Sequence, residues 1–192
     1  LITNVAVAAT VTVVVAAHDL ALAGSVAFGA TLLGAGAVFT AVGAVAAQMA
    51  SGSRAALGLG GLVLGIAYAL RAVGDVALPA LTWLSPIGWA QGIRAYADER
   101  WWVLVLPVTA SVALFAAAFA LQARRDLGAG ILPDQPGPAA ASPRLSSPWG
   151  LAVRLQRTSV ISWVVAMAVL SFLYGVIADE AEAIVEDNPE ME

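Results

Sequence analysis

The sequence predicts an all-α, polytopic membrane protein with five transmembrane helices and an extracellular re-entrant helical hairpin. Of its 192 residues, 60% are hydrophobic and only 11% are charged, whereas an ordinary soluble domain is about 25% charged. The apolar residues form long runs between short polar turns, and about 20 such residues suffice to cross a bilayer. Because lipid offers the backbone no hydrogen-bonding partners, runs of this kind must be helical.

The five predicted spans are residues 2–17, 22–48, 55–73, 102–122 and 159–178. The first is slightly short for a bilayer and ends at His18 and Asp19, which are either a polar pair at the membrane surface or a proton relay. Since the chain begins inside an apolar run and ends in an acidic stretch, we expect it to be a piece of a larger polytopic protein.

Glycine is concentrated in the second and third spans. Small residues let helix backbones approach closely in lipid, so these spans are predicted to pack tightly, although a glycine-lined face could instead flex during transport. The glycines concerned are Gly24, Gly29, Gly34, Gly36 and Gly43 in the second span, and Gly61 and Gly65, at the four-residue spacing of close helix pairs, in the third.

A tryptophan-rich segment, residues 75–102, separates the third and fourth spans and holds four of the six Trp. Trp and Tyr concentrate where hydrocarbon meets water, because their rings are apolar at one end and polar at the other. Two more crossings would need about 40 residues, which the segment does not have. We therefore expect residues 75–100 to dip into one face of the membrane as a helical hairpin.

The second part of the chain begins with a linker. Pro, Gly, Ala and Ser dominate residues 123–150, which predicts a cytoplasmic connection between two bundles. Residues 151–157 then place Arg154 and Arg157 on one face and leucines on another, as in a short interfacial helix. The domain organisation expected is a first bundle at 1–122, the linker, the start of a second bundle at 151–178, and an acidic extracellular loop at 179–192.

Arginine placement orients the predicted spans. Cytoplasmic loops carry an excess of Arg and Lys, and one side of the predicted topology holds twice as many Arg as the other. The tryptophan-rich hairpin then faces outward. The inward arginines are Arg54, Arg124, Arg125, Arg144, Arg154 and Arg157, and the outward ones are Arg71, Arg94 and Arg100.

The composition excludes several chemistries. A single His and no Cys cannot build a zinc site, and no Walker-type loop is present for ATP hydrolysis. The span interiors carry no Asp, Glu or Lys, which disfavours an ion-coupled secondary transporter. No basic nucleic-acid face is visible. We expect no enzyme activity and no cofactor, which leaves a permease, a channel or a membrane scaffold.

Three sequence pieces, in this order, resemble a known family. They are Leu84-Ser85-Pro86-Ile87-Gly88-Trp89, the DERWW of residues 98–102, and the RRDLGAG of residues 124–130. Together they resemble the permease subunits of type-2 ABC exporters, of the actinobacterial type that exports polyketide antibiotics. The resemblance covers nearly the whole chain.

The resemblance implies a permease of two six-span halves, of which this chain matches the last four spans of the first half, the linker and the first span of the second. Residues 75–100 would be the extracellular re-entrant helices, and 151–157, with Arg154 and Arg157, the interfacial connecting helix. The family works with a separate ABC ATPase subunit. Its first-half coupling helix would precede Leu1, so the main ATPase contact is expected outside these residues.

The function expected from this resemblance is that of the transmembrane permease subunit of an ATP-driven exporter in the cell membrane. It would move amphiphilic small molecules such as antibiotics, in contact with membrane lipid and without nucleic acid. A non-transporting membrane anchor or assembly subunit is the alternative.

Candidate site residues lie in the hairpin and at the end of the third span. The expected extracellular gate comprises Trp83, Ser85, Pro86 and Trp89, and the expected path or gate contacts are Tyr68, Arg71 and Asp75. The alternative role for the tryptophans is an interfacial aromatic belt. The alternative for Arg71 and Asp75, which are one helical turn apart, is a surface ion pair.

Overall fold

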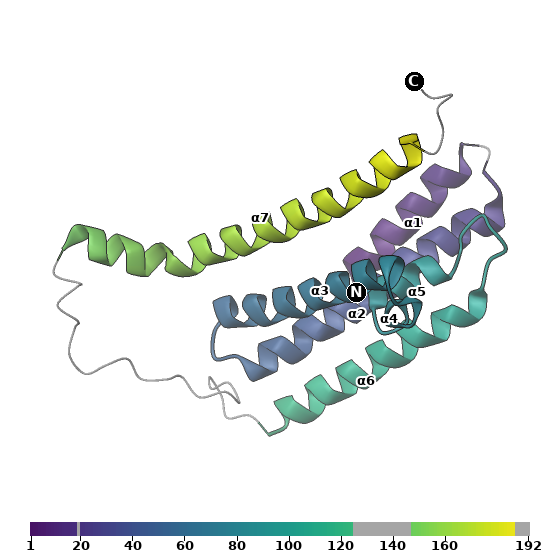
Figure 1. Ribbon diagram of the computed structural model, residues 1–192. Helices are drawn as coiled ribbons and strands as arrows, with labels where there is room; N and C mark the ends of the chain where they lie inside the picture. The colour runs from purple at the N-terminus through teal and green to yellow at the C-terminus, as the bar shows by residue number, and fades with distance from the viewer. Residues whose placement is uncertain (19, 125–146, 187–192) are drawn as a thin grey trace. The chain divides into compact units, whose positions relative to one another are not determined.

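A computed structural model describes residues 1–18, 20–124 and 147–186, without the side chains of residues 173, 174 and 176–186. It divides into two compact units, Leu1–Gln135 and Pro136–Glu192, which we treat separately. Every regular element in the described part is helical (Figure 1).

The first unit contains four longer helices and a short helical insertion. The longer helices are α1 (Ile2–Ala16), α2 (Leu22–Met49), α3 (Ser53–Val76) and α6 (Val105–Gln122). The insertion between α3 and α6 consists of α4 (Pro79–Thr82), α5 (Pro86–Gly92) and the 3-10 helix η1 (Trp101–Leu104). The second unit contains α7 (Pro148–Glu186).

Four helical stretches are long and apolar enough to cross a membrane: Leu22–Met49, Ser53–Val76, Trp101–Gln122 and Pro148–Phe172. The prediction of an all-α, multi-pass membrane protein is thereby confirmed. The helix at the first predicted span, α1, has 15 residues and is about 22 Å long at 1.5 Å per residue, against a hydrocarbon core of about 30 Å.

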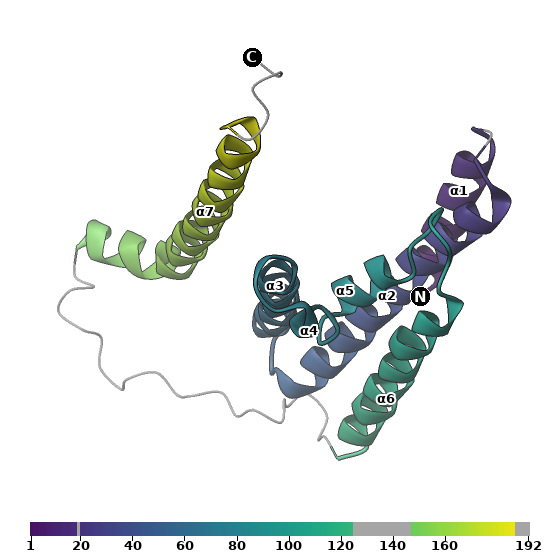
Figure 2. The same ribbon diagram turned by 45° about the vertical axis from the view of Figure 1, so that its right-hand side comes forward.

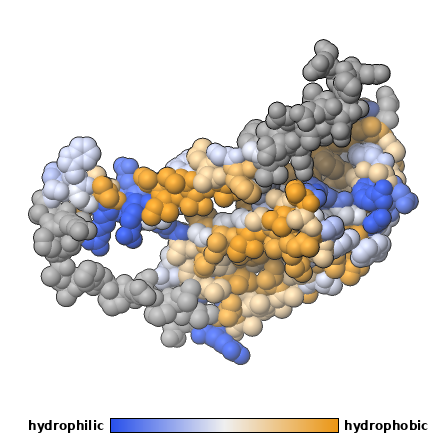
Figure 3. All heavy atoms as spheres, in the orientation of Figure 1, coloured by the Kyte–Doolittle hydropathy of each residue, from blue (hydrophilic) through white to orange (hydrophobic). Residues whose placement is uncertain are grey.

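Large apolar side chains on the outside of the helices agree with a lipid environment. Leu57 on α3 is 77% exposed and Phe119 on α6 is 69% exposed. Apolar residues cover the visible faces of the helices, whereas hydrophilic residues gather near helix ends (Figure 3). A water-soluble monomer rarely exposes so much contiguous apolar surface.

Helix α2 is the centre of the first unit and packs against α1, α3, α5 and α6. Close packing was predicted at five glycines of this helix, and four of them have a close neighbour. Tyr96 lies against Gly24, Thr12 of α1 against Gly29, Pro107 of α6 against Gly34, and Asn4 of α1 against Gly36. Among the described residues, no neighbour lies within 4 Å of the Cβ position at Gly43, nor at Gly61 and Gly65 of α3, so the close helix contact predicted at Gly61 and Gly65 has no partner there.

These contacts fix the helix directions. Asn4 donates a hydrogen bond from Nδ2 to Thr40 Oγ1 (2.9 Å), and Thr12 packs further back along α2, so α1 and α2 are antiparallel. Val103, just before α6, packs in one buried cluster with Ala27 of α2, and Pro107 of α6 packs against Gly34 further along α2, so α6 and α2 run the same way. The α1–α2 turn, the end of α3 and the start of α6 therefore lie at one end of the unit, as the predicted topology requires.

Helix α7 contains two predicted segments. Residues 151–157, the predicted interfacial helix, and residues 159–178, the predicted span, belong to one helix that bends near its start (Figure 1). No Gly or Pro interrupts residues 151–174, which explains the continuity. Residues 179–186, predicted as loop, are helical, because Ala and Glu are strong helix formers. The linker residues 125–146 and residues 187–192 lie outside the described residues.

Candidate functional site

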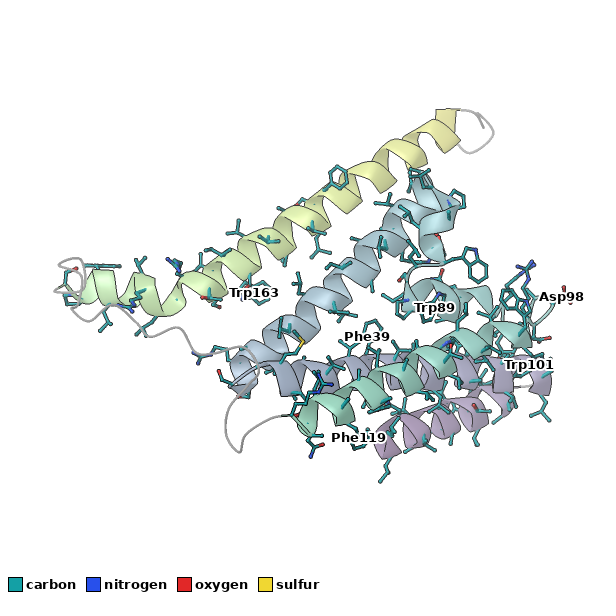
Figure 4. All side chains as sticks on the ribbon, turned by 90° about the horizontal axis from the view of Figure 1, so that it is seen from below. Phe39, Trp89, Asp98, Trp101, Phe119 and Trp163 are labelled. Atoms are coloured by element: carbon teal, nitrogen blue, oxygen red, sulfur yellow. The ribbon has the colours of Figure 1, made fainter. Side chains whose placement is uncertain are left out.

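The tryptophan-rich insertion forms a cap on the first unit. We define the cap as residues 77–104, which comprise α4, α5, the loop 93–100 and η1. It leaves α3 and joins α6 at the same end of the unit (Figures 1 and 2). Helix α4 packs against α3 and α5, whereas α5 packs against α2, α3 and α6. Figure 4 shows Trp89, Asp98 and Trp101 toward this end and Phe119 at the opposite end of α6. That residues 75–100 dip into the outer face of the membrane stays a prediction.

Ser85 attaches the cap to α3. Its side chain is fully buried, and its Oγ donates a hydrogen bond to the carbonyl oxygen of Ala67 in the middle of α3 (2.6 Å). The same Oγ accepts from the backbone N–H of Ile87 (3.2 Å), so Ser85 is also the N-cap of α5. Pro86 occupies the first turn of α5, where its missing N–H costs nothing.

Thr82 is wedged between two glycines. A Cβ at Gly74 of α3 would lie 2.6 Å from the backbone nitrogen of Thr82, and a Cβ at Gly88 of α5 would lie 2.7 Å from Thr82 Cγ2 and closer still to its carbonyl oxygen. Real Cβ contacts are essentially never below 3.0 Å. Only glycine at both positions allows α3, α4 and α5 to meet at this point.

Three tryptophans make the cap's apolar surface. Trp83 stacks on Trp102 with ring centroids 5.7 Å apart and an interplanar angle of 18°. Trp89 donates from Nε1 to the carbonyl oxygen of Trp83 (2.6 Å) and packs against the buried cluster of Ala27, Ile93 and Val103. The stack remains partly exposed, so it can touch lipid or an amphiphile, whereas Trp89 mainly joins α5 to α4 and the core.

Arg71 joins the cap to α3 a second time. It forms an ion pair with Asp75, one turn further along α3, and donates a hydrogen bond to Gln91 of α5. The Arg71 side chain is 16% exposed and that of Asp75 is 49% exposed. The predicted pair therefore exists, and it includes a third residue, Gln91, that the sequence did not indicate.

The loop 93–100 folds back on itself and holds the cap to α2. Arg94, Tyr96 and Asp98 all have positive φ angles (56°, 67° and 64°), which L-residues rarely adopt. Tyr96 donates a hydrogen bond to Ser25 Oγ of α2 (3.1 Å), and its ring covers Gly24. These contacts hold the loop in a conformation that local preferences disfavour.

The other predicted site residues lie apart from these contacts. Tyr68 is half-exposed on α3. Arg154 and Arg157 lie in the first turns of α7, in the second unit. His18 approaches the carbonyl oxygen of Val14 through Nδ1 (2.8 Å), whereas its proposed relay partner Asp19 lies outside the described residues. Among described residues, no group of three His, Cys, Asp or Glu is placed to hold a metal ion.

A groove between α2 and α6 was missed by the sequence analysis. Its volume is about 440 Å³ and its lining is almost wholly apolar. Sequence spacing could not reveal it, because every lining residue is an ordinary member of an apolar span. The lining residues are Leu1, Ala30, Leu33, Gly34, Ala37, Leu104, Pro107, Val108, Ser111, Val112 and Phe115.

Comparison with known proteins shows that the chain is similar to a membrane transport protein. Over 161 residues the chain is 48% identical to the multidrug efflux system permease protein Rv1217c of Mycobacterium tuberculosis (strain ATCC 25618 / H37Rv). The chain is thus similar to an efflux permease. The alignment covers 84% of the chain but 29% of that relative, so the chain spans under a third of the relative's length. Residues 145–192 also match the family model for the C-terminal domain of the multidrug efflux system permease Rv1217c.

Proposed function

We propose that this chain is part of the transmembrane permease of an ATP-driven exporter that moves amphiphilic small molecules across the cytoplasmic membrane. The observation that carries the proposal is the 48% identity to a multidrug efflux permease over most of the chain. The four long apolar helices supply the membrane-embedded scaffold such a permease needs. A separate ABC ATPase subunit would hydrolyse the ATP.

The finer assignment is to the type-2 ABC exporters of polyketide-antibiotic type, with two halves joined by the linker 123–150. Support comes from the three sequence pieces in the cap and after α6. Support also comes from the family match, which begins at residue 145 and is to a C-terminal domain, and from the separate compact unit that begins at Pro136. The bent start of α7, with Arg154 and Arg157, would serve as the interfacial connecting helix.

The cap is proposed to be the outer gate. Two polar contacts attach it to α3, from Ser85 to Ala67 and from Arg71 to Gln91. A hydrogen bond contributes about 0.5–1.5 kcal/mol net, so breaking these two contacts would cost only a few kcal/mol in each transport cycle. The cluster around Ile93 would keep the cap attached to α2 meanwhile. The exposed Trp83–Trp102 stack and Tyr68 would offer apolar contacts to an amphiphile.

A reversible crosslink tests the gate. In an otherwise cysteine-free full-length permease assembled with its ATPase, Arg71→Cys with Gln91→Cys would be bridged by a bifunctional methanethiosulfonate. ATP-dependent efflux of the dye Hoechst 33342 should stop and return on reduction. A matched bridge between Asn4→Cys and Thr40→Cys, which joins α1 to α2, should leave efflux intact. Efflux that continues with the cap bridged would remove the gate assignment.

The alternative function, a non-transporting membrane anchor or assembly subunit, makes a different biochemical prediction. A permease of this class should co-purify with a nucleotide-binding subunit and stimulate ATP hydrolysis when substrate is added. An anchor should show neither property. Purification of the full-length protein from its native membrane, followed by an ATPase assay with and without Hoechst 33342, separates the two.

A further inference from the structure

The groove between α2 and α6 contains a buried hydroxyl. Ser111 is 7% exposed, and its Oγ has no hydrogen-bond partner among the described residues. In membrane helices, Ser and Thr hydroxyls ordinarily donate to the carbonyl oxygen four residues earlier. Five hydroxyls of the first unit follow that rule: Thr12, Ser25, Thr31, Thr40 and Thr109.

Ser111 also lies at mid-depth. It is the eleventh of the 22 residues in the candidate span Trp101–Gln122, so about 16 Å of helix separates it from either end. Lipid headgroups and ester groups lie near the ends of a span, and an acyl chain carries no hydrogen-bonding group. A phospholipid could fill the groove but could not pair with this hydroxyl.

The rest of the lining restricts the ligand further. None of the described residues that line the groove has a charged side chain, so a charged ligand would find no counter-charge among them in a region of low dielectric constant. A volume of about 440 Å³ falls within the usual range of small-molecule sites, about 300–1,000 Å³. Gly34 keeps the groove narrow at that point by allowing Pro107 to approach α2 closely.

We infer that this groove binds a neutral, largely apolar molecule that carries an embedded carbonyl, ether or hydroxyl group, and that Ser111 Oγ hydrogen-bonds to that group. This inference rests on the proposed function, because it names the chemical class of the exported molecule. It places recognition in the membrane interior, between α2 and α6, and assigns no recognition of the polar group to the cap.

A binding measurement with tritiated progesterone tests the inference. This neutral steroid carries ketones, and its enone crosslinks to neighbouring residues under ultraviolet light. The full-length permease in lipid nanodiscs should bind it saturably above empty nanodiscs, with crosslinks in α2 or α6. Ser111→Ala should weaken binding about three- to tenfold, the effect of one hydrogen bond. Ala37→Phe, which fills the groove, should abolish binding.

Thr109→Val is the matched control, because it removes a hydroxyl from the same helix outside the groove and should leave binding unchanged. Thermal unfolding midpoints identify any variant that fails to fold. The crosslinks of progesterone to the unmodified permease locate the site without the use of any variant. If binding is lost in Ala37→Phe but unchanged in Ser111→Ala, the Ser111 hydroxyl takes no part in binding. That is the result expected of a groove that holds only an acyl chain, and it would overturn the inference. If progesterone shows no saturable binding, the groove is a packing surface, and the inference is overturned as well.

Hoechst 33342 efflux by the complete transporter is measured in parallel. Progesterone binding with the expected variant pattern, but without ATP-dependent efflux, would contradict the proposed export function and leave the groove as a binding site. Efflux with progesterone binding that is insensitive to Ser111→Ala would contradict the groove inference alone.

Discussion

Replacing Gly74 by Ala should detach the cap from α3. The new Cβ on α3 would lie 2.6 Å from the backbone nitrogen of Thr82 in α4 and closer still to Thr82 Oγ1, whereas ordinary contact begins at 3.4 Å. The backbone of α3 or α4 must therefore move by about 0.8 Å, the difference between the two distances. Because one of the overlapping atoms belongs to the backbone, no rotamer change relieves the overlap.

The expected cost can be compared with the expected gain. Overpacking a fitted contact costs about 1–3 kcal/mol, and Ala gains up to about 1 kcal/mol over Gly in a helix interior. A backbone overlap lies at the upper end of the first range, so we expect Gly74→Ala to favour cap opening by about 2 kcal/mol, or about thirtyfold in the opening equilibrium.

Thiol labelling measures that equilibrium. Ala67 is 3% exposed beneath the cap, so a cysteine placed there reacts with a maleimide only when the cap opens. Labelling should accelerate about thirtyfold in Gly74→Ala. In the matched variant Gly61→Ala, on the same helix, no neighbour among the described residues lies within 4 Å of the Cβ position, so labelling should stay at the parent rate.

A second-site variant sharpens the test. Thr82→Ala removes Oγ1 but not the backbone nitrogen, so it should not restore slow labelling to Gly74→Ala. Slow labelling in Gly74→Ala, or equal acceleration in Gly61→Ala, would refute the contact of Thr82 with Gly74 as the one that seats the cap on α3.

Two further predictions concern the loop 93–100 and are measured by thermal unfolding of the full-length protein. Tyr96→Phe should lower stability by only about 0.5–1.5 kcal/mol, since Ser25 keeps its bond to a helix carbonyl; a larger loss would mean that the phenol has a partner besides Ser25. Arg94→Gly should raise stability by up to about 1 kcal/mol, because glycine adopts the positive φ angle at that position without strain. Arg100→Gly, where φ is −96°, is its control and should not stabilise, so equal effects of the two would show that relief of backbone strain is not the cause.

The sequence was sufficient for the helical layout. Runs of apolar residues separated by arginines and short polar turns predict helices because lipid leaves the backbone no other partners. The tryptophan-rich segment was too short to cross twice, and the structure shows two short helices there. Residue pairs one helical turn apart, such as Arg71 and Asp75, were also within reach of sequence reasoning. The side of the membrane on which the cap lies stays a prediction from the arginines.

Contacts between segments distant in the chain depended on the tertiary structure. Glycine spacing identified α2 and α3 equally as close-packing helices, yet only in α2 do most of the glycines meet a partner, because a glycine's role depends on what lies opposite it. For the same reason, the sequence could not indicate that Gln91 lies beside Arg71 or that the hydroxyl of Ser111 has no partner among the described residues. Sequence by itself determined which segments are apolar enough to enter a membrane, since that is a property of each segment's own solvation. Only the fold decided which side chains meet, since that requires the positions of two segments at once.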